Sequence, residues 1–195
     1  MEYLDLCDEN GLPTGEVINR SRAHREGLRH RTAHVWIVRR CGNGYRILLQ
    51  KRSAGKDSFP GLYDTSSAGH IPAGAEPLPS ALRELSEELG IAARPEDLHF
   101  AGIFRNRYEA EFRGEIFRDN EVTWVYVFFR PVDSDSLKLQ EEEVEAVDWF
   151  DLQEVREEIT RSCARFCVAA VGLDVLIDYL KRNPFLLPDQ TDKAP

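Results

Sequence analysis

One stretch of the chain, residues 69–91, limits the possible folds more than any other. Pro79 suits the first turn of a helix and Gly90 suits the position just beyond its end, so we expect a helix over residues 79–89. Apolar residues recur at helical spacing and share one face of this helix. They are Leu78, Ala81, Leu82, Leu85 and Leu89. The pattern is typical of a helix that packs on a larger core.

Three glutamates of the same helix form an acidic patch beside the apolar face. Glu84, Glu87 and Glu88 stand at i, i+3 and i+4, which brings them together on the helix surface. Like charges at this spacing repel by roughly a few tenths of a kcal/mol per pair, and a divalent cation would reverse that sign. The patch therefore favours a metal site, and a solvated acidic face is the alternative.

The spacing of the whole stretch resembles the Nudix box, G-x5-E-x7-R-E-U-x-E-E-x-G-U, in which U is an aliphatic residue. Its fixed positions hold Gly69, Arg83, Glu84, Leu85, Glu87, Glu88, Gly90 and Ile91. One position differs, because Ala75 stands where the family has its first glutamate and Glu76 follows one place later. In the family that glutamate supports the loop, and Glu76 is the candidate for this task here.

The resemblance implies an α/β Nudix fold, a mixed β-sheet sandwiched between α-helices, and an enzyme that cleaves diphosphate linkages with Mg²⁺ or Mn²⁺. Residues 1–183 are expected to form one domain, with a β-hairpin within residues 1–20 and a C-terminal helix over residues 162–182. This helix should pack on the domain or on a second subunit, which leaves a homodimer open. A loose tail is expected over residues 184–195.

Outside the box, roughly residues 2–160 are similar to a branch of the superfamily that includes type I isopentenyl diphosphate isomerase and related bacterial hydrolases. The similarity rests on short segments at residues 8–11, 23–24, 28–31, 34–37, 51–52, 59–62, 68–70 and 120–122. Histidines and glutamates bind a metal in the isomerase. The residues near those positions here are His24, His30, His70, Asp119 and Glu121. Structural hydrogen bonds are the alternative role for the histidines.

One departure separates isomerase chemistry from hydrolysis. The isomerase needs a cysteine directly before its Gly-His pair to move a proton on the hydrocarbon, and this chain has Ala68 before Gly69 and His70. Alanine cannot transfer a proton, whereas hydrolysis needs only a metal, water and a base. The sequence therefore favours hydrolysis.

The resemblance also assigns roles to single residues. The expected metal ligands are Glu84, Glu87, Glu88 and Glu121. Arg83 should orient the loop and a glutamate rather than touch substrate. The expected substrate contacts are Arg52, Lys56 and His70. Solvated surface cations are the alternative for the arginine and the lysine.

The general base has three candidate places. Glu121 is the first, because its strand is expected to face the site. Glu143, in an acidic run before the last predicted strand, is the second, since many Nudix hydrolases recruit a base from that loop. Glu87 or Glu88 itself is the third.

Length and charge exclude several classes of partner. The chain has 195 residues, which suits one domain with a sizeable core, and a net charge of −9, which disfavours nucleic acid and anionic membranes. It begins without a basic segment followed by an apolar run, so we expect a cytoplasmic protein. The four cysteines form no C-x-x-C pair and are interpreted as reduced thiols.

These features predict a metal-dependent hydrolase that uses a metal-activated water to cleave a diphosphate linkage in a nucleoside diphosphate derivative or a similar organic pyrophosphate. A small-molecule diphosphate is the expected partner. Two alternatives stay open, an isopentenyl-diphosphate-isomerase-like enzyme and a non-catalytic ligand-sensing module. The complete acidic patch with Arg83 argues against the sensor, which has no need of metal ligands.

Overall fold

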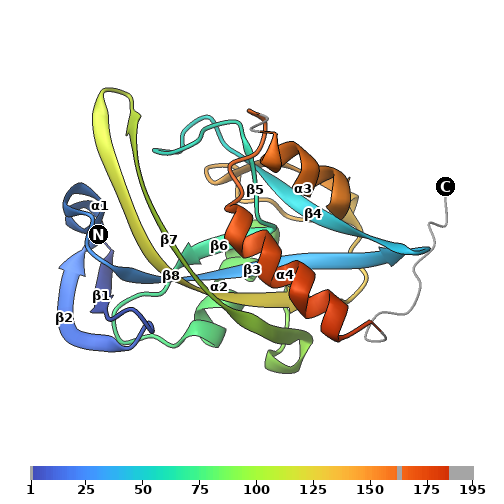
Figure 1. Ribbon diagram of the computed structural model, residues 1–195, viewed down its shortest axis with the longest axis horizontal. Helices are drawn as coiled ribbons and strands as arrows, with labels where there is room; N and C mark the ends of the chain where they lie inside the picture. Colours follow the sequence, from blue (N-terminus) through green and yellow to red (C-terminus); the bar gives the residue numbers. More distant parts are fainter. Residues whose placement is uncertain (1, 162–163, 185–195) are drawn as a thin grey trace.

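The computed structural model describes residues 2–161 and 164–184 (Figure 1). The strands are β1 (Tyr3–Cys7), β2 (Pro13–Asn19), β3 (His30–Cys41), β4 (Gly44–Arg52), β5 (Tyr63–Asp64), β6 (Ser67–His70), β7 (Leu98–Phe112), β8 (Glu115–Phe128) and β9 (Val144–Asp151). The α-helices are α1 (Arg20–Glu26), α2 (Pro77–Leu89), α3 (Leu152–Thr160) and α4 (Ala170–Arg182).

A mixed sheet of seven strands forms the centre of the fold. Its strand order is β5-β4-β3-β8-β7, with β6 paired to β3 and β9 paired to β4. Strands β3 and β8 run parallel, and the other pairs run antiparallel. Strands β1 and β2 form a separate two-stranded sheet, as expected for the N-terminal hairpin.

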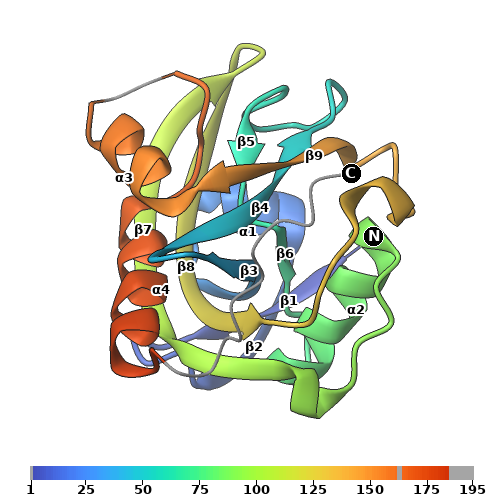
Figure 2. The ribbon, with the colours of Figure 1, turned by 90° about the vertical axis from the view of Figure 1, so that its right-hand side faces the viewer.

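Strand β3 explains why helices cover both faces of the sheet. It is apolar on both sides, and alternate side chains of a strand point in opposite directions. Trp36 and Val38 belong to the core that includes α3 and α4, whereas Val35 and Ile37 belong to the core that includes α2. Figure 2 shows α2 on one side of the sheet and α3 and α4 on the opposite side. The predicted sandwich is confirmed.

Helix α2 carries the box glutamates and follows the prediction closely. It begins at Pro77 and ends at Leu89. Gly90 has a φ of 70°, the left-handed conformation in which many helices end. Leu85 and Leu89 are fully buried, so the apolar face fixes the rotation of the helix and aims the acidic patch away from the core.

The C-terminal helix is shorter than the sequence predicts. Helix α4 begins only at Ala170, and residues 162–163 and 185–195 lie outside the described residues. The prediction is wrong over residues 164–169, because this segment pairs with β5: Tyr63 N donates to Arg165 O, and Cys167 N donates to Tyr63 O, both at 2.9 Å. Helix α4 packs on its own domain through buried leucines. No helix among the described residues is long and apolar enough to cross a membrane.

Strands β7 and β8 form a long hairpin whose far half reaches past the rest of the sheet (Figure 1). We call this projecting part, residues 107–120, the arm. Its turn lies at residues 113–114. Residues 118–120 carry Asp and Asn but form no turn, because Asp119 pairs with Tyr108 inside the hairpin. Asp and Asn are typical of turns, and only the long-range pairing overrides that preference here.

Candidate active site

A cavity of about 540 Å³ lies among α2, α1, the arm and the loop of residues 53–62. This volume suits a small organic ligand. The cavity is lined by all the residues that the sequence assigns to the site, namely Arg52, Lys56, His70, Arg83, Glu84, Glu87, Glu88, Glu121 and Glu143. They come from strands, helices and loops far apart in the sequence, so the fold gathers them around one space.

Glu88 lies at the buried end of the acidic patch. Only 4% of its surface is exposed, and its Oε2 accepts a hydrogen bond from Ala68 N at 3.1 Å and lies 3.4 Å from Gln50 Nε2. Burial raises the pKa of Glu88 to about 7. A carboxylate in these surroundings is stabilised by a cation, because a buried charge needs a partner.

Gly69 makes room for Glu84. A Cβ atom at position 69 would lie 2.1 Å from Glu84 Cδ, so any larger residue would displace that carboxylate. Burial also raises the pKa of Glu84. The first glycine of the box therefore shapes the cavity wall and lets β6 lie against α2.

Arg83 binds the box glutamates rather than open solvent. Its guanidinium contacts Glu84 Oε1 at 2.6 Å and Glu87 Oε2 at 2.9 Å, and it donates to the carbonyl of His70 at 3.2 Å. These contacts support the predicted orienting role. In the part of the chain that the structure describes, the three box carboxylates do not bring one oxygen each within 4.8 Å of one another.

Two residues that sequence reasoning missed hold the loop before α2. The buried Arg31 donates to Asp5 Oδ2 at 2.7 Å and to Ala75 O at 3.0 Å, and Gly74 N donates to the same Asp5 oxygen at 2.8 Å. Glu76 is exposed and caps no backbone N–H of α2. The loop thus depends on the Asp5–Arg31 pair, and only the docking of β1 beside β3 brings these two residues together.

A second group of polar side chains lies deeper in the cavity, and strand register explains it. Strand β3 runs between β6 and β8, so His30 pairs with Glu121 on one side and Thr32 pairs with His70 on the other. Asp119 stands two residues before Glu121 in β8. Helix α1 supplies the fifth residue of this group, the buried His24, beside His30, His70, Asp119 and Glu121.

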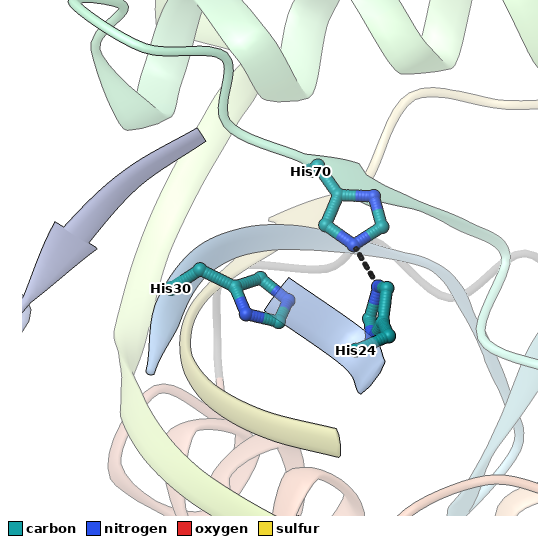
Figure 3. A group of neighbouring side chains, drawn as sticks. All are labelled: His24, His30 and His70. Atoms are coloured by element: carbon teal, nitrogen blue, oxygen red, sulfur yellow. Dashed lines mark hydrogen bonds between the residues drawn. The ribbon is translucent and has the colours of Figure 1, made fainter. Parts of the chain in front are cut away.

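The three imidazole rings converge (Figure 3). The Nε2 atoms of His24 and His70 lie 3.1 Å apart, and ligand atoms from His24, His30 and His70 lie within 4.8 Å of one another. The same holds for His30, Asp119 and Glu121. We call these five residues the imidazole–carboxylate centre.

The ring of His30 has a defined tautomer. Its Nδ1 lies 2.8 Å from Leu28 O, which can only accept, so Nδ1 carries the proton. In the neutral ring Nε2 is then unprotonated, and it faces Glu121 Oε1 at 3.6 Å. A proton or a metal cation between these two atoms would satisfy both. His30 therefore has the orientation of a metal ligand.

The centre fits a divalent cation. Three of its buried polar atoms, His24 Nδ1, His30 Nε2 and Asp119 Oδ1, have no hydrogen-bond partner among the described residues. Burial lowers the pKa of His24 to about 4 and that of His70 well below its usual range, so both rings are neutral and can donate lone pairs. Neutral imidazoles beside two carboxylates form a donor set for a metal ion.

Arg52, Lys56 and Glu143 form the wall opposite α2. Arg52 donates to Asp64 Oδ2 at 3.0 Å and to Ser58 O at 3.0 Å, so it fixes the start of the 53–62 loop. Lys56 Nζ is paired with Glu143 Oε2. The backbone of Glu143 is anchored, because its carbonyl accepts from Ser53 N at 3.0 Å. Glu143 thus has a defined position.

Comparison with known proteins agrees with this geometry. The family model described as NUDIX domain matches residues 28–166. The chain is 40% identical over 162 residues to Nudix hydrolase 3 of Arabidopsis thaliana, a match that covers 82% of this chain and 20% of that protein. The chain therefore belongs to the Nudix hydrolase family.

Solved structures support the fold. A crystal structure from Deinococcus radiodurans has a TM-score of 0.65 at 19% identity and covers 90% of this chain and 98% of its own. The NUDIX domain of NrtR from Shewanella oneidensis, complexed with ADP ribose, has a TM-score of 0.54 at 17% identity and covers 79% and 87% of the two chains. At these identities the likeness concerns the fold alone.

Proposed function

We propose that this protein is a divalent-cation-dependent hydrolase that cleaves a diphosphate linkage in a nucleoside diphosphate derivative or a similar organic pyrophosphate. One observation carries the proposal: a single polar cavity joins the box glutamates, four of the five members of the imidazole–carboxylate centre and the cationic side chains of Arg52 and Lys56. The structural neighbour that holds ADP ribose supports a nucleoside diphosphate derivative as the first class to test.

Two sets of residues are proposed to hold the cations. Glu84, Glu87 and Glu88 offer the oxygen ligands that Mg²⁺ and Mn²⁺ accept, whereas the imidazole–carboxylate centre offers nitrogen and oxygen, which suits Mn²⁺ better than Mg²⁺. A bound cation supplies positive charge to the diphosphate oxygens and lowers the pKa of a water molecule. Arg83 keeps Glu84 and Glu87 in place through its two contacts.

Lys56 links substrate binding to the base. A diphosphate that enters the cavity competes with Glu143 for the ammonium group of Lys56. When Lys56 pairs with a phosphate oxygen, the carboxylate of Glu143 becomes able to accept a proton from water. Binding of the substrate would thus prepare the base at the moment when it is needed.

We assign the base to Glu143 and a ligand role to Glu121, which reverses the order expected from the sequence. Glu121 Oε2 lies 3.3 Å from the hydroxyl of Thr32, and its Oε1 faces His30. Both oxygens are therefore engaged inside the imidazole–carboxylate centre.

A hydrolysis screen read by anion-exchange chromatography tests the proposed function, because cleavage between two organic groups gives two phosphate monoesters and no free phosphate. The panel contains sugar nucleotides, nucleoside diphosphates and triphosphates, coenzymes and prenyl diphosphates, each with Mg²⁺, with Mn²⁺ and with excess chelator. We expect cleavage of at least one nucleoside diphosphate derivative with either cation and none in chelator. Cleavage that is unaffected by chelator, or no cleavage of any diphosphate compound, would contradict the proposal.

The imidazole–carboxylate centre also favours a second candidate, an isopentenyl-diphosphate-isomerase-like enzyme, because its five members fall near the metal-binding positions of the isomerase and converge here. Ala68 opposes it, since it lines the cavity where the isomerase has its cysteine. Proton exchange from heavy water into isopentenyl diphosphate without phosphate release would favour the isomerase, and we expect no exchange.

A further inference from the structure

The contact between the arm and the 53–62 loop contains two residues in an unusual backbone conformation. Phe59 has a φ of 49° and Arg113 a φ of 52°, and they are the only non-glycine residues with positive φ in the described part of the chain. Side chains with a Cβ disfavour this region, so the surrounding structure must hold both residues there. The two lie more than fifty positions apart in the sequence, one in the loop and one at the tip of the arm.

Side-chain contacts hold the arm and the loop together. Arg113 Nη2 donates to Ala54 O at 3.1 Å and lies 3.4 Å from Lys56 O. The ring of Phe59 packs edge-on against Phe112 with centroids 4.8 Å apart, and it lies 5.7 Å from the ring of Tyr108. Arg113 therefore ties the tip of the arm to the same loop that presents Lys56 to the cavity.

The arm and the loop place three aromatic side chains on the cavity wall. Phe59, Tyr108 and Phe117 all line the cavity and are half-buried. Phe117 stacks on His24, with ring centroids 4.3 Å apart and an interplanar angle of 20°, so this wall begins at the imidazole–carboxylate centre. It ends at the loop that carries the proposed phosphate contacts. An organic group attached to a diphosphate would therefore lie against these rings.

We propose that Phe59, Tyr108 and Phe117 form a subsite for a planar aromatic ring, such as a nucleobase, on the organic group of the substrate, and that Arg113 is a positioning residue that keeps this subsite closed. The proposal rests on the proposed function, because a diphosphate must first bind beside Lys56. Beyond that function, it specifies the class of organic group that the cavity selects, a planar aromatic ring.

Polar surroundings favour a ring with polar edges over an alkyl chain. The hydroxyl of Tyr108 lies in the electrostatic field of Asp64, Asp119 and Arg52. An alkyl chain on this wall would offer the hydroxyl of Tyr108 no hydrogen bond. A heteroaromatic ring can stack its face on the three aromatic side chains and direct its polar edge toward that hydroxyl.

Binding measured without turnover tests the subsite. Isothermal titration calorimetry in Ca²⁺ compares ADP, GDP, CDP and UDP with isopentenyl diphosphate, which carries the same diphosphate but no ring. We expect the unmutated protein to bind the nucleoside diphosphates about fivefold or more tightly than isopentenyl diphosphate. In Phe59→Leu, which keeps apolar volume and loses the ring, this ratio should fall toward one.

A second variant separates positioning from folding. Arg113→Asn removes the guanidinium, while Asn tolerates the left-handed backbone better than Arg does. We expect the affinity ratio to fall about threefold or more, with a melting temperature no lower than that of the unmutated protein. Arg156→Gln is the matched control, because it removes the same charge from an exposed residue of α3 and should leave the ratio unchanged.

The outcomes distinguish this inference from the proposed function. If the unmutated protein binds neither kind of diphosphate, the diphosphate site is refuted and the subsite with it. If nucleoside diphosphates and isopentenyl diphosphate bind equally, or if Phe59→Leu keeps the affinity ratio of the unmutated protein, the subsite alone is refuted. A fall in the ratio for Arg113→Asn that accompanies a large loss of thermal stability would overturn the positioning role.

Discussion

The variant Asp119→Asn should separate the cation-free stability of the protein from its response to metal. Burial and the charge of Glu121 raise the pKa of Asp119 to about 9, so without a cation this side chain is already neutral at pH 7. Asparagine has nearly the same shape, and we expect little change of stability in chelator. With a cation the unmutated protein and the Asp119→Asn variant differ in stability, because the amide is a much poorer ligand than a carboxylate.

The expected magnitude follows from linkage. A cation at about 100 times its dissociation constant stabilises the fold by about 2.7 kcal/mol, and roughly 2–4 °C per kcal/mol for a domain of this size gives a melting shift of about 5–10 °C. If the lost ligand weakens binding about 100-fold, the same cation concentration contributes only about 0.4 kcal/mol. The shift should then shrink to about 1 °C.

Thermal unfolding in chelator measures the stability without a cation, and thermal unfolding in Mn²⁺ measures the melting shift that the cation causes. All proteins carry Glu88→Gln as a background, so that a cation at the box glutamates adds little to the shift. Asp135→Asn is the control, because Asp135 is exposed in a turn outside the cavity. An Asp119→Asn variant with the full Mn²⁺ shift would refute the reasoning, as would a large loss of stability already present in chelator.

Three further predictions concern other parts of the site. Glu143→Gln should lower kcat about 100-fold or more with KM little changed, whereas Glu121→Gln should lower the affinity for Mn²⁺. If Glu121→Gln lowers kcat in this way and Glu143→Gln does not, the base is Glu121. In chelator, the raised pKa of Glu88 means that the folded state holds the proton more tightly, so this residue's contribution to stability should be lost as pH rises from 4.5 through about 7. Urea unfolding against pH should give a flatter curve for Glu88→Gln, and parallel curves would contradict the burial argument. Gly69→Ala should destabilise the protein by about 1–3 kcal/mol through overpacking, whereas Gly55→Ala, whose new Cβ would lie 3.8 Å from the nearest neighbouring atom, should not.

The parts of the fold that depend on neighbours in the sequence could be predicted. Helix α2 has its apolar spacing and its terminal glycine within one short stretch, and both signals act locally. The same is true of α3, where Asp151, a residue type that favours the cap position, accepts hydrogen bonds from Gln153 N and Glu154 N. The acidic patch follows from helical geometry once the helix is known.

Features that depend on pairing between distant segments could not be predicted from the residues alone. The resemblance names the histidines of the imidazole–carboxylate centre, but their convergence depends on the position of β3 between β6 and β8. The Asp5–Arg31 pair and the contact of Arg113 with the 53–62 loop join residues far apart in the chain. The late start of α4 has the same cause, since Cys167 is engaged by Tyr63.

The central claim is that cations held in this cavity act on a diphosphate linkage. The most direct test is steady-state hydrolysis of the best compound from the screen by the unmutated protein and by Glu88→Gln, with Mg²⁺ or Mn²⁺, after circular dichroism has shown that the variant is folded. The account predicts that kcat of the variant falls by a factor on the order of 10³ or more, because a buried carboxylate ligand is lost. A folded Glu88→Gln variant with the unmutated rate would contradict it.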